Sequence, residues 1–249
     1  MPSRTTRALA IGCVVFACLG LSGCGLTPPP VPDAVSSSSP GNEAGNALPA
    51  RTTEAVAPAG FTDYERAALR VRNVGCGQVS SGSGFAISDH VFVTNRHVIG
   101  GAALLQVSTY DGHDIEVAAT GAVVIADLAL VWTKEALPAT IPLARENPGV
   151  GTNVTVVGFP LGGPLTTTHG KVLGYAPDPV GWSVLPMLVN DAPIEHGSSG
   201  SPVINDSGQL VGVAYAIDGS KYAVPVEILR QVLSNPSSYS RSAACDGAL

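Results

Sequence analysis

The serine at position 199 stands between glycines, in the segment Gly197-Ser198-Ser199-Gly200-Ser201-Pro202. Apolar runs at 183–189 and 209–216 flank this segment and favour β-strands, so the segment is predicted to be a tight loop. Glycines permit a backbone bend that points neighbouring N–H groups at one spot, which is the geometry that stabilises an oxyanion. The same composition is typical of an ordinary turn. The prediction therefore depends on whether a base and a carboxylate occur elsewhere.

Two other segments supply those groups. His97 lies just beyond a predicted strand, and Asp127 lies between two apolar runs, where an unpaired carboxylate would be costly to bury. A serine hydroxyl is a weak nucleophile until a neighbouring base takes its proton, and an imidazole base needs a carboxylate that fixes its tautomer. The set His97, Asp127 and Ser199 is therefore a candidate for nucleophilic catalysis.

Four motifs carry a resemblance to a known family. They are Gly82-Ser83-Gly84-Phe85, Thr94-Asn95-Arg96-His97-Val98, Asp127-Leu128-Ala129-Leu130 and Gly197-Ser198-Ser199-Gly200-Ser201-Pro202. In this order and spacing, the chain from about Gly82 to its C-terminal helix resembles the trypsin-like serine proteases of the bacterial HtrA/Deg-like and glutamyl-endopeptidase-like branches. The resemblance implies an all-β, chymotrypsin-like fold of two six-stranded antiparallel barrels. A short N-terminal helix and a C-terminal helix are predicted from the residues themselves.

The resemblance also assigns roles to the residues at the matching positions. Ser199 would attack a peptide carbonyl, His97 would transfer the proton, and Asp127 would orient His97. The backbone N–H groups of Gly197 and Ser199 would bind the oxyanion. Ser198 stands where digestive members of the family carry an aspartate that pairs with a freshly cut N-terminus, so activation through that ion pair is not expected.

The substrate pocket is expected at two segments, one before the serine loop and one on a later strand. The residues predicted to line it are Pro193, Ile194, His196, Ala214, Tyr215 and Ala216. Pro193 stands where trypsin has its acidic selector, so cleavage after lysine or arginine is not expected. The apolar walls favour a small or medium apolar residue, and Lys221 leaves a preference for acidic residues open.

Other ionisable residues match no catalytic motif. The histidines predicted to lie in surface loops are His90, His113 and His169. Asp111 and Asp114 are alternatives to Asp127, but they occur in a glycine-containing turn that we expect them to cap. Asp191 is predicted to be structural.

The overall composition favours a β-rich globular protein. At 249 residues with 45% hydrophobic residues, the chain is long enough for one or two compact domains. The 29 glycines and 20 prolines indicate many turns, and predicted strands recur about every ten residues, as in barrels. The formal net charge of −6 argues against a nucleic-acid partner, which would require a basic face.

Two helices are predicted outside the strands. Thr62-Asp63-Tyr64-Glu65 has the pattern of a capping box and predicts a helix from Thr62 to about Arg72. A second helix is predicted over 225–233, with apolar side chains on one face.

The N-terminal residues indicate export and lipidation. Residues 1–23 combine a basic start with a short apolar run and are predicted to be a lipoprotein signal peptide. Leu21-Ser22-Gly23-Cys24 resembles the lipobox of bacterial lipoproteins, which implies cleavage before Cys24 and acylation there; a simple secretory signal with a chance cysteine is the alternative. Residues 24–60, rich in Pro, Ser, Ala and Gly, are predicted to be a disordered tether, and residues 61–249 the protease domain.

Two cysteines lie beyond the targeting region. Cys76 and Cys245 are expected to form one disulfide in an exported protein, with two free buried cysteines as the alternative. No second cysteine or histidine stands at ligand spacing from either of them, so no metal or other cofactor is expected.

Together these features predict a serine endopeptidase anchored by lipid to the extracytoplasmic face of the cell membrane. Its partners would be peptide or protein substrates and the membrane, with no nucleic acid, and the sequence leaves the oligomeric state open. The alternative is a catalytically silent or latent lipoprotein of the same fold that binds peptides or envelope proteins.

Overall fold

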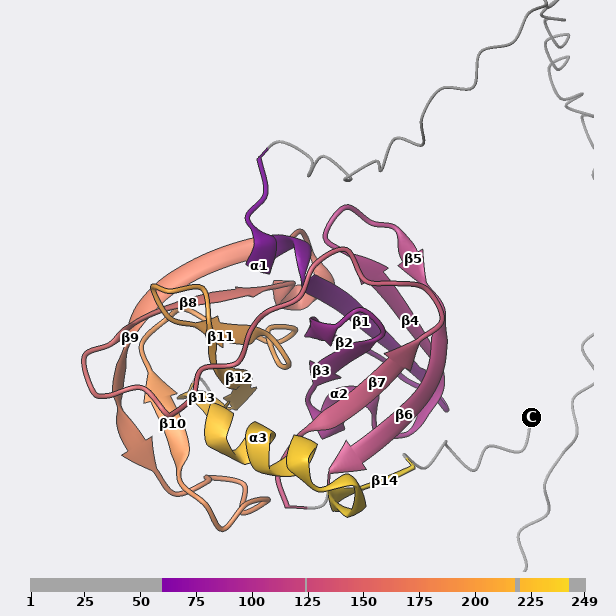
Figure 1. Ribbon diagram of the computed structural model, residues 1–249. Helices are drawn as coiled ribbons and strands as arrows, with labels where there is room; N and C mark the ends of the chain where they lie inside the picture. The colour runs from indigo at the N-terminus through magenta and orange to yellow at the C-terminus, as the bar shows by residue number, and fades with distance from the viewer. Residues whose placement is uncertain (1–59, 124, 218–219, 242–249) are drawn as a thin grey trace, which may run out of the picture. The chain divides into compact units, whose positions relative to one another are not determined.

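The computed structural model describes residues 60–241, apart from residues 124 and 218–219 (Figure 1). The predicted signal peptide, Cys24, residues 24–59 of the predicted tether and Cys245 lie outside the described residues. In the part of the chain that is described, two β-sheets hold far more residues than the helices, which are short. No helix within that part is long and apolar enough to cross a membrane.

The first sheet contains eight antiparallel strands in the described residues, in the order β14-β6-β7-β3-β2-β1-β4-β5. Their bounds are β1 Ala68–Gly75, β2 Val79–Ser88, β3 Val91–Thr94, β4 Ala102–Thr109, β5 Asp114–Ile115, β6 Val117–Val123, β7 Ala129–Thr133 and β14 Tyr239–Arg241. Strand β1 pairs with β2 on one side and with β4 on the other. The sheet curves around buried apolar side chains such as Phe85, Phe92 and Leu128.

The second sheet is a closed barrel with the strand order β10-β13-β12-β11-β8-β9. The bounds are β8 Asn153–Gly158, β9 Thr166–Ala176, β10 Met187–Asn190, β11 Pro202–Ile204, β12 Leu210–Ile217 and β13 Ser220–Pro225. The predicted all-β, chymotrypsin-like arrangement of two antiparallel barrels is confirmed. Within the described ranges, six strands close the second barrel, and the first sheet adds the short strands β5 and β14 to six others.

The first helix, α1 (Asp63–Arg66), is shorter than predicted. Its capping box is present, because the Thr62 side chain accepts from the Glu65 N–H while the Glu65 carboxylate accepts from the Thr62 N–H. The prediction that the helix continues to about Arg72 was wrong, since β1 begins at Ala68. Leu69 and Val71 are buried on one face of β1 and Arg72 is exposed, so the two-residue period of a strand replaces the helical period.

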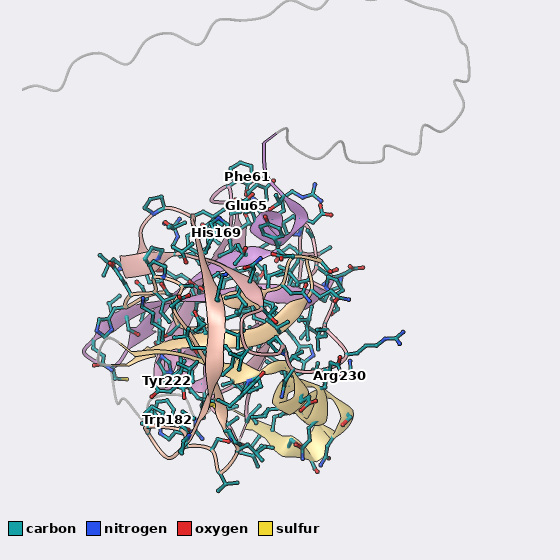
Figure 2. All side chains as sticks on the ribbon, turned by 90° about the vertical axis from the view of Figure 1, so that its left-hand side faces the viewer. Phe61, Glu65, His169, Trp182, Tyr222 and Arg230 are labelled. Carbon is teal, nitrogen blue, oxygen red and sulfur yellow. The ribbon has the colours of Figure 1, made fainter. Side chains whose placement is uncertain are left out.

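Glu65 links this first turn to the second barrel (Figure 2). One carboxylate oxygen accepts from the N–H and hydroxyl of Thr62 at 2.9 and 2.8 Å, and the other accepts from the Thr167 hydroxyl of β9 at 3.0 Å. Burial opposes ionisation of Glu65, but these hydrogen bonds outweigh it and lower the pKa of the carboxyl below its ordinary value of 4.5.

Replacing Glu65 with glutamine is expected to lower Tm by about 1–4 °C at pH 7. A lowered pKa in the folded state means that the stabilisation is complete above pH 4.5 and is lost as the pH falls through the folded value. The Tm difference between wild type and Glu65→Gln should therefore shrink from pH 7 to pH 3 in thermal melts followed by circular dichroism. Glu146→Gln, an exposed carboxylate without a hydrogen bond in the described structure, should leave Tm unchanged. An undiminished difference at pH 3 would contradict the assignment.

After the second barrel the chain returns to the first sheet. The predicted C-terminal helix is confirmed as α3 (Val226–Ser234), which buries Val226, Ile228, Leu229 and Val232 against the barrel. A single 3₁₀ turn, η2 (Pro236–Ser238), then leads into β14. Strand β14 pairs with β6, placing Arg241 opposite Gly121, and the rings of Tyr239 and Trp132 lie 5.8 Å apart.

Candidate active site

His97 lies immediately after the end of β3, in the one-turn helix α2 (Arg96–Ile99). Asn95 precedes the helix and is fully buried. Its side-chain amide donates to the backbone carbonyl of Asp127 at 2.8 Å, so Asn95 fixes the segment between β6 and β7 beside the helix. The local structure thus brings two segments 30 residues apart against each other.

The Asp127 carboxylate binds His97 with both of its oxygens. One oxygen accepts from the His97 backbone N–H at 3.0 Å, and the other lies 2.6 Å from Nδ1 of the imidazole. The Asp127 side chain is only 2% exposed. Because a carboxylate can only accept, the imidazole proton must lie on Nδ1, which leaves Nε2 as the nitrogen able to accept a proton.

The serine loop is bent by two glycines. Gly197 and Gly200 both have φ of +89°, in the region that side chains rarely adopt. Gly200 donates its N–H to the Ala214 carbonyl of β12 at 2.8 Å. A Cβ at Gly200 would lie 2.0 Å from the carbonyl oxygen of Ser83 on β2. Only glycine therefore fits at this position, where the serine loop contacts the backbone of the first sheet.

Two backbone N–H groups of this loop have no protein acceptor. Among the described residues, neither the N–H of Gly197 nor that of Ser199 donates a hydrogen bond. The preceding carbonyl, that of His196, accepts from the N–H of Leu161 at 2.6 Å. The His196 carbonyl and the Gly197 N–H belong to the same trans peptide group and therefore point in opposite directions. The hydrogen bond from Leu161 thus directs the Gly197 N–H away from Leu161. Leu161 itself has φ of 56°, within the 3₁₀ turn η1 (Pro160–Gly162).

Ser83 on β2 ties the serine loop to the first sheet. Its N–H donates to the Ser199 carbonyl at 2.7 Å, and its hydroxyl donates to the Gly197 carbonyl at 2.8 Å. The same hydroxyl accepts from the N–H of Phe159 at 2.9 Å.

From the sequence, Ser83 could be identified only as part of a motif, and its role in holding the serine loop was missed. The signal in the sequence is a serine between two glycines, and the structure shows that a Cβ at Gly82 or Gly84 would come within 3.0 Å of Val98 or Phe92.

The structure brings His97 and Asp127 into direct contact but does not bond His97 to Ser199. In the described part of the chain, the Ser199 hydroxyl and His97 Nε2 take part in no hydrogen bond. Catalytic hydrogen bonds of this kind are often long before substrate binds. The predicted roles of Ser199, and of Gly197 and Ser199 as oxyanion donors, remain predictions.

The predicted pocket residues lie on both sides of the serine loop. Ala214 and Tyr215 are buried in β12, and Ala216 lies opposite Lys221 in the strand pairing. Ile194 is half-buried, whereas Pro193 and His196 are exposed. Pro193 borders a cavity of about 150 Å³ behind the loop, and the other lining residues are Val156, Gly158, Pro160, Thr166, Thr168, Glu195, Ser198 and Ser201.

None of the remaining candidates forms a hydrogen bond with His97 in the described residues. His90, His113 and His169 are exposed. Asp111 accepts from the Thr109 hydroxyl, and this bond is the main cause of the lowered pKa of its carboxyl. Asp114 is exposed in β5, and Asp191 accepts from the N–H of Lys171. No cluster of three or more His, Cys, Asp or Glu residues suited to a metal occurs among the described residues.

Cys76 lies between β1 and β2 and is disulfide-bonded. Its partner is outside the described residues, as is Cys245, so the predicted pairing of Cys76 with Cys245 stays a prediction.

Two β-barrels, a His–Asp pair and a glycine-containing serine loop that Ser83 ties to the first sheet define the class of trypsin-like peptidases. The family model described as trypsin-like peptidase domain matches residues 82–213, and the chain belongs to this family.

The relatives narrow the comparison to the HtrA/Deg group. Serine protease HTRA2, mitochondrial, of Bos taurus is 33% identical over 166 residues, which make up 62% of this chain and 36% of the relative. Serine endoprotease DegS of Haemophilus influenzae is 28% identical over 177 residues, 66% of this chain and 50% of the relative. The chain thus matches half or less of these relatives. The crystal structure of Rv3671c protease from M. tuberculosis in its active form has a TM-score of 0.65 at 26% identity, with 74% of this chain and 87% of that chain covered.

Proposed function

We propose that this protein is a serine endopeptidase that acts on the extracytoplasmic side of a membrane. The observation that carries the proposal is the pair of hydrogen bonds from His97 to Asp127. The serine loop, which Ser83 ties to the first sheet, supports it, since the N–H groups of Gly197 and Ser199 have no acceptor among the described residues. Membership of the trypsin-like peptidase family supports the same reaction class.

In the proposed reaction, Ser199 Oγ attacks the carbonyl carbon of the scissile peptide while its proton passes to His97 Nε2. The oxyanion that forms accepts hydrogen bonds from the N–H groups of Gly197 and Ser199. The imidazolium, held by Asp127, then gives its proton to the leaving amine, and an acyl-enzyme remains. Water attacks this ester with His97 again as base, which releases the carboxylic acid and restores Ser199.

The proposed location rests on the N-terminal sequence. We assign lipidation to Cys24 and a tethering role to residues 24–60, because the segment before Cys24 resembles a lipobox and the following residues cannot build a core. Two or more acyl chains give stable anchoring, whereas one is marginal. The name of one relative, probable periplasmic serine endoprotease DegP-like of Ectopseudomonas mendocina, 32% identical over 163 residues, supports an extracytoplasmic site.

We assign Cys245 as the disulfide partner of Cys76. Cys245 follows shortly after Arg241, the last residue of β14, and Cys76 is disulfide-bonded at the turn between β1 and β2. In the chain-entropy model, a loop of this length would contribute about 4–5 kcal/mol at most.

Labelling with a fluorophosphonate probe tests the proposed function. The full-length protein in detergent should be modified at Ser199, as located by mass spectrometry, because only an activated serine attacks the phosphorus. Ser199→Ala should not be labelled. Ser207→Ala, which removes an exposed hydroxyl in the turn between β11 and β12, should be labelled at the wild-type rate.

A latent enzyme is the second candidate, because Ser199 and His97 share no hydrogen bond in the described structure. A latent enzyme would be labelled only after a partner or a change in redox state orders the loop. A catalytically silent protein that binds peptides would stay unlabelled under every condition, and that result would refute the proposed function.

A further inference from the structure

A tryptophan of the second barrel lies against the imidazole of His97. The loop of residues 177–186, which connects β9 to β10, carries Trp182. The ring centroids of Trp182 and His97 are 5.7 Å apart, with 29° between the ring planes. The guanidinium carbon of Arg96 lies 5.6 Å from the centroid of the same indole. In Figure 2, Trp182 lies below Tyr222, on the side of the molecule away from Glu65. The His97 ring is therefore covered on one face by a residue from the other barrel.

Asp178 holds this loop in place. One oxygen of its carboxylate accepts from the N–H of Val180 at 3.0 Å and from the hydroxyl of Tyr215 at 3.1 Å. The other oxygen accepts from the N–H of Ser183 at 2.8 Å, next to Trp182. Charged acceptors make stronger hydrogen bonds than neutral ones, so Asp178 organises the loop on both sides of the indole.

Tyr215 connects the loop to the strand that supports the serine. It is 1% exposed in β12, and its ring stacks on Tyr222 with centroids 5.8 Å apart. Burial, followed by the charge of Asp178, raises the pKa of the Tyr215 phenol well above its usual range. The phenol therefore remains a donor to Asp178 at any working pH. The neighbouring Ala214 accepts from the Gly200 N–H, so the strand that holds the serine loop also anchors the loop of Trp182.

We propose that Trp182 is a specificity-determining residue that forms the wall of the substrate subsite beside His97. Aromatic rings in contact have centroids about 4.5–7 Å apart, so the observed 5.7 Å leaves no layer between indole and imidazole for a side chain. A substrate that reaches Ser199 must pass this wall with one of the two residues before or the two residues after the scissile bond. At that position the enzyme accepts compact side chains, such as those of glycine, alanine and serine, and rejects bulky ones, such as those of leucine and phenylalanine. This inference rests on the proposed function.

Selectivity for peptides tests the wall. The substrates form a peptide series that varies four positions, the two residues before and the two residues after the scissile bond. Each position is occupied in turn by alanine, leucine or phenylalanine. At one of these positions, wild type should prefer alanine, and Trp182→Ala should reduce the ratio of kcat/KM between alanine and phenylalanine peptides by about 10-fold or more. The change should arise mainly from a lower KM for the bulky peptide.

Two further variants make this result specific. Tyr215→Phe removes the phenol donor to Asp178 and should shift selectivity in the same direction by a smaller factor, because the indole remains but its loop is less firmly held. Trp132→Phe alters the other tryptophan of the chain, on β7 beside Tyr239, and should leave selectivity unchanged. Unchanged selectivity at all four positions in Trp182→Ala would overturn the inference.

Tryptophan fluorescence provides a readout that does not depend on turnover. The chain contains two tryptophans, so Trp132→Phe leaves Trp182 as the single emitter. Its emission should shift when a fluorophosphonate modifies Ser199, because the adduct occupies the space next to the wall. The emission of Trp132 in Trp182→Phe should not shift. An unchanged Trp182 spectrum on a fully labelled protein would show that the indole does not border the occupied site.

The two proposals fail in different ways. If wild type and Trp182→Ala are both labelled at Ser199 and cleave peptides with the same selectivity, the assignment of Trp182 is wrong and the protein is still a serine endopeptidase. If wild type is never labelled, the proposed function itself is wrong.

Discussion

Asp127→Asn is expected to lower kcat for peptide cleavage by about 10⁴-fold while the fold is retained. In wild type, the two carboxylate oxygens accept from the His97 N–H at 3.0 Å and from Nδ1 at 2.6 Å. Asparagine has one acceptor oxygen, which the backbone N–H of His97 requires. The amide NH₂ then faces Nδ1 and forces it to become the acceptor. The ring proton moves to Nε2, which can no longer take a proton from Ser199.

Steady-state kinetics on a fluorogenic peptide measure this loss, and circular dichroism checks the fold. Asp206→Asn is the matched control and should give wild-type kcat. Asp206 lies in the turn between β11 and β12, where its exposed carboxylate accepts a hydrogen bond from the Asn153 side chain. A reduction of less than about 10-fold in Asp127→Asn would show that the tautomer of His97 is not set by this carboxylate.

Gly197→Ala is expected to lower kcat by about 10²–10³-fold, the usual effect of losing one oxyanion donor. A Cβ at Gly197 would lie 2.6 Å from the nitrogen of Leu161 and 2.8 Å from the carbonyl oxygen of Phe159. These are backbone atoms, which cannot move aside as a side chain can. The loop must therefore shift, and the Gly197 N–H leaves the position where the oxyanion forms, so the loss falls on kcat more than on KM.

Gly208→Ala separates this effect from backbone strain alone. Gly208 also has a positive φ, +72°, but a Cβ there meets nothing within 4 Å. The substitution should cost about 1–2 kcal/mol of stability and leave kcat unchanged. Equal kinetic losses in the two variants would mean that general destabilisation, rather than the position of the Gly197 N–H, explains the result.

Local patterns in the sequence predicted local structure well. The Thr62–Glu65 capping box depends on residues three apart and appears as expected. The predicted end of the same helix was wrong. Residues from Ala68 onward form β1 because they pair with β2 and β4, and the sequence near Leu69 does not show this pairing. The residues His97, Asp127 and Ser199 could be selected because their neighbours form family motifs.

The supporting contacts of the site could not be predicted in the same way. The hydroxyl of Ser83 reaches Gly197 across 114 residues, and the hydrogen bond from Tyr215 to Asp178 spans 37. Such contacts depend on how strands from two sheets are placed, not on nearby residues. Trp182 lies in a loop without a periodic pattern, so nothing in its own segment indicates that it covers His97.

Strand β14, the last strand among the described residues, covers the edge of a sheet whose other strands lie between residues 68 and 133. Ribosomes release the N-terminal end first, so β6 and Trp132 emerge long before Tyr239, which pairs with and packs on them. Until β14 is made, β6 has no partner on that side, and an unpaired strand edge readily joins foreign chains. The first sheet is therefore completed only after the second barrel has been synthesised, and a substitution in β14 would affect a sheet whose other strands lie between residues 68 and 133.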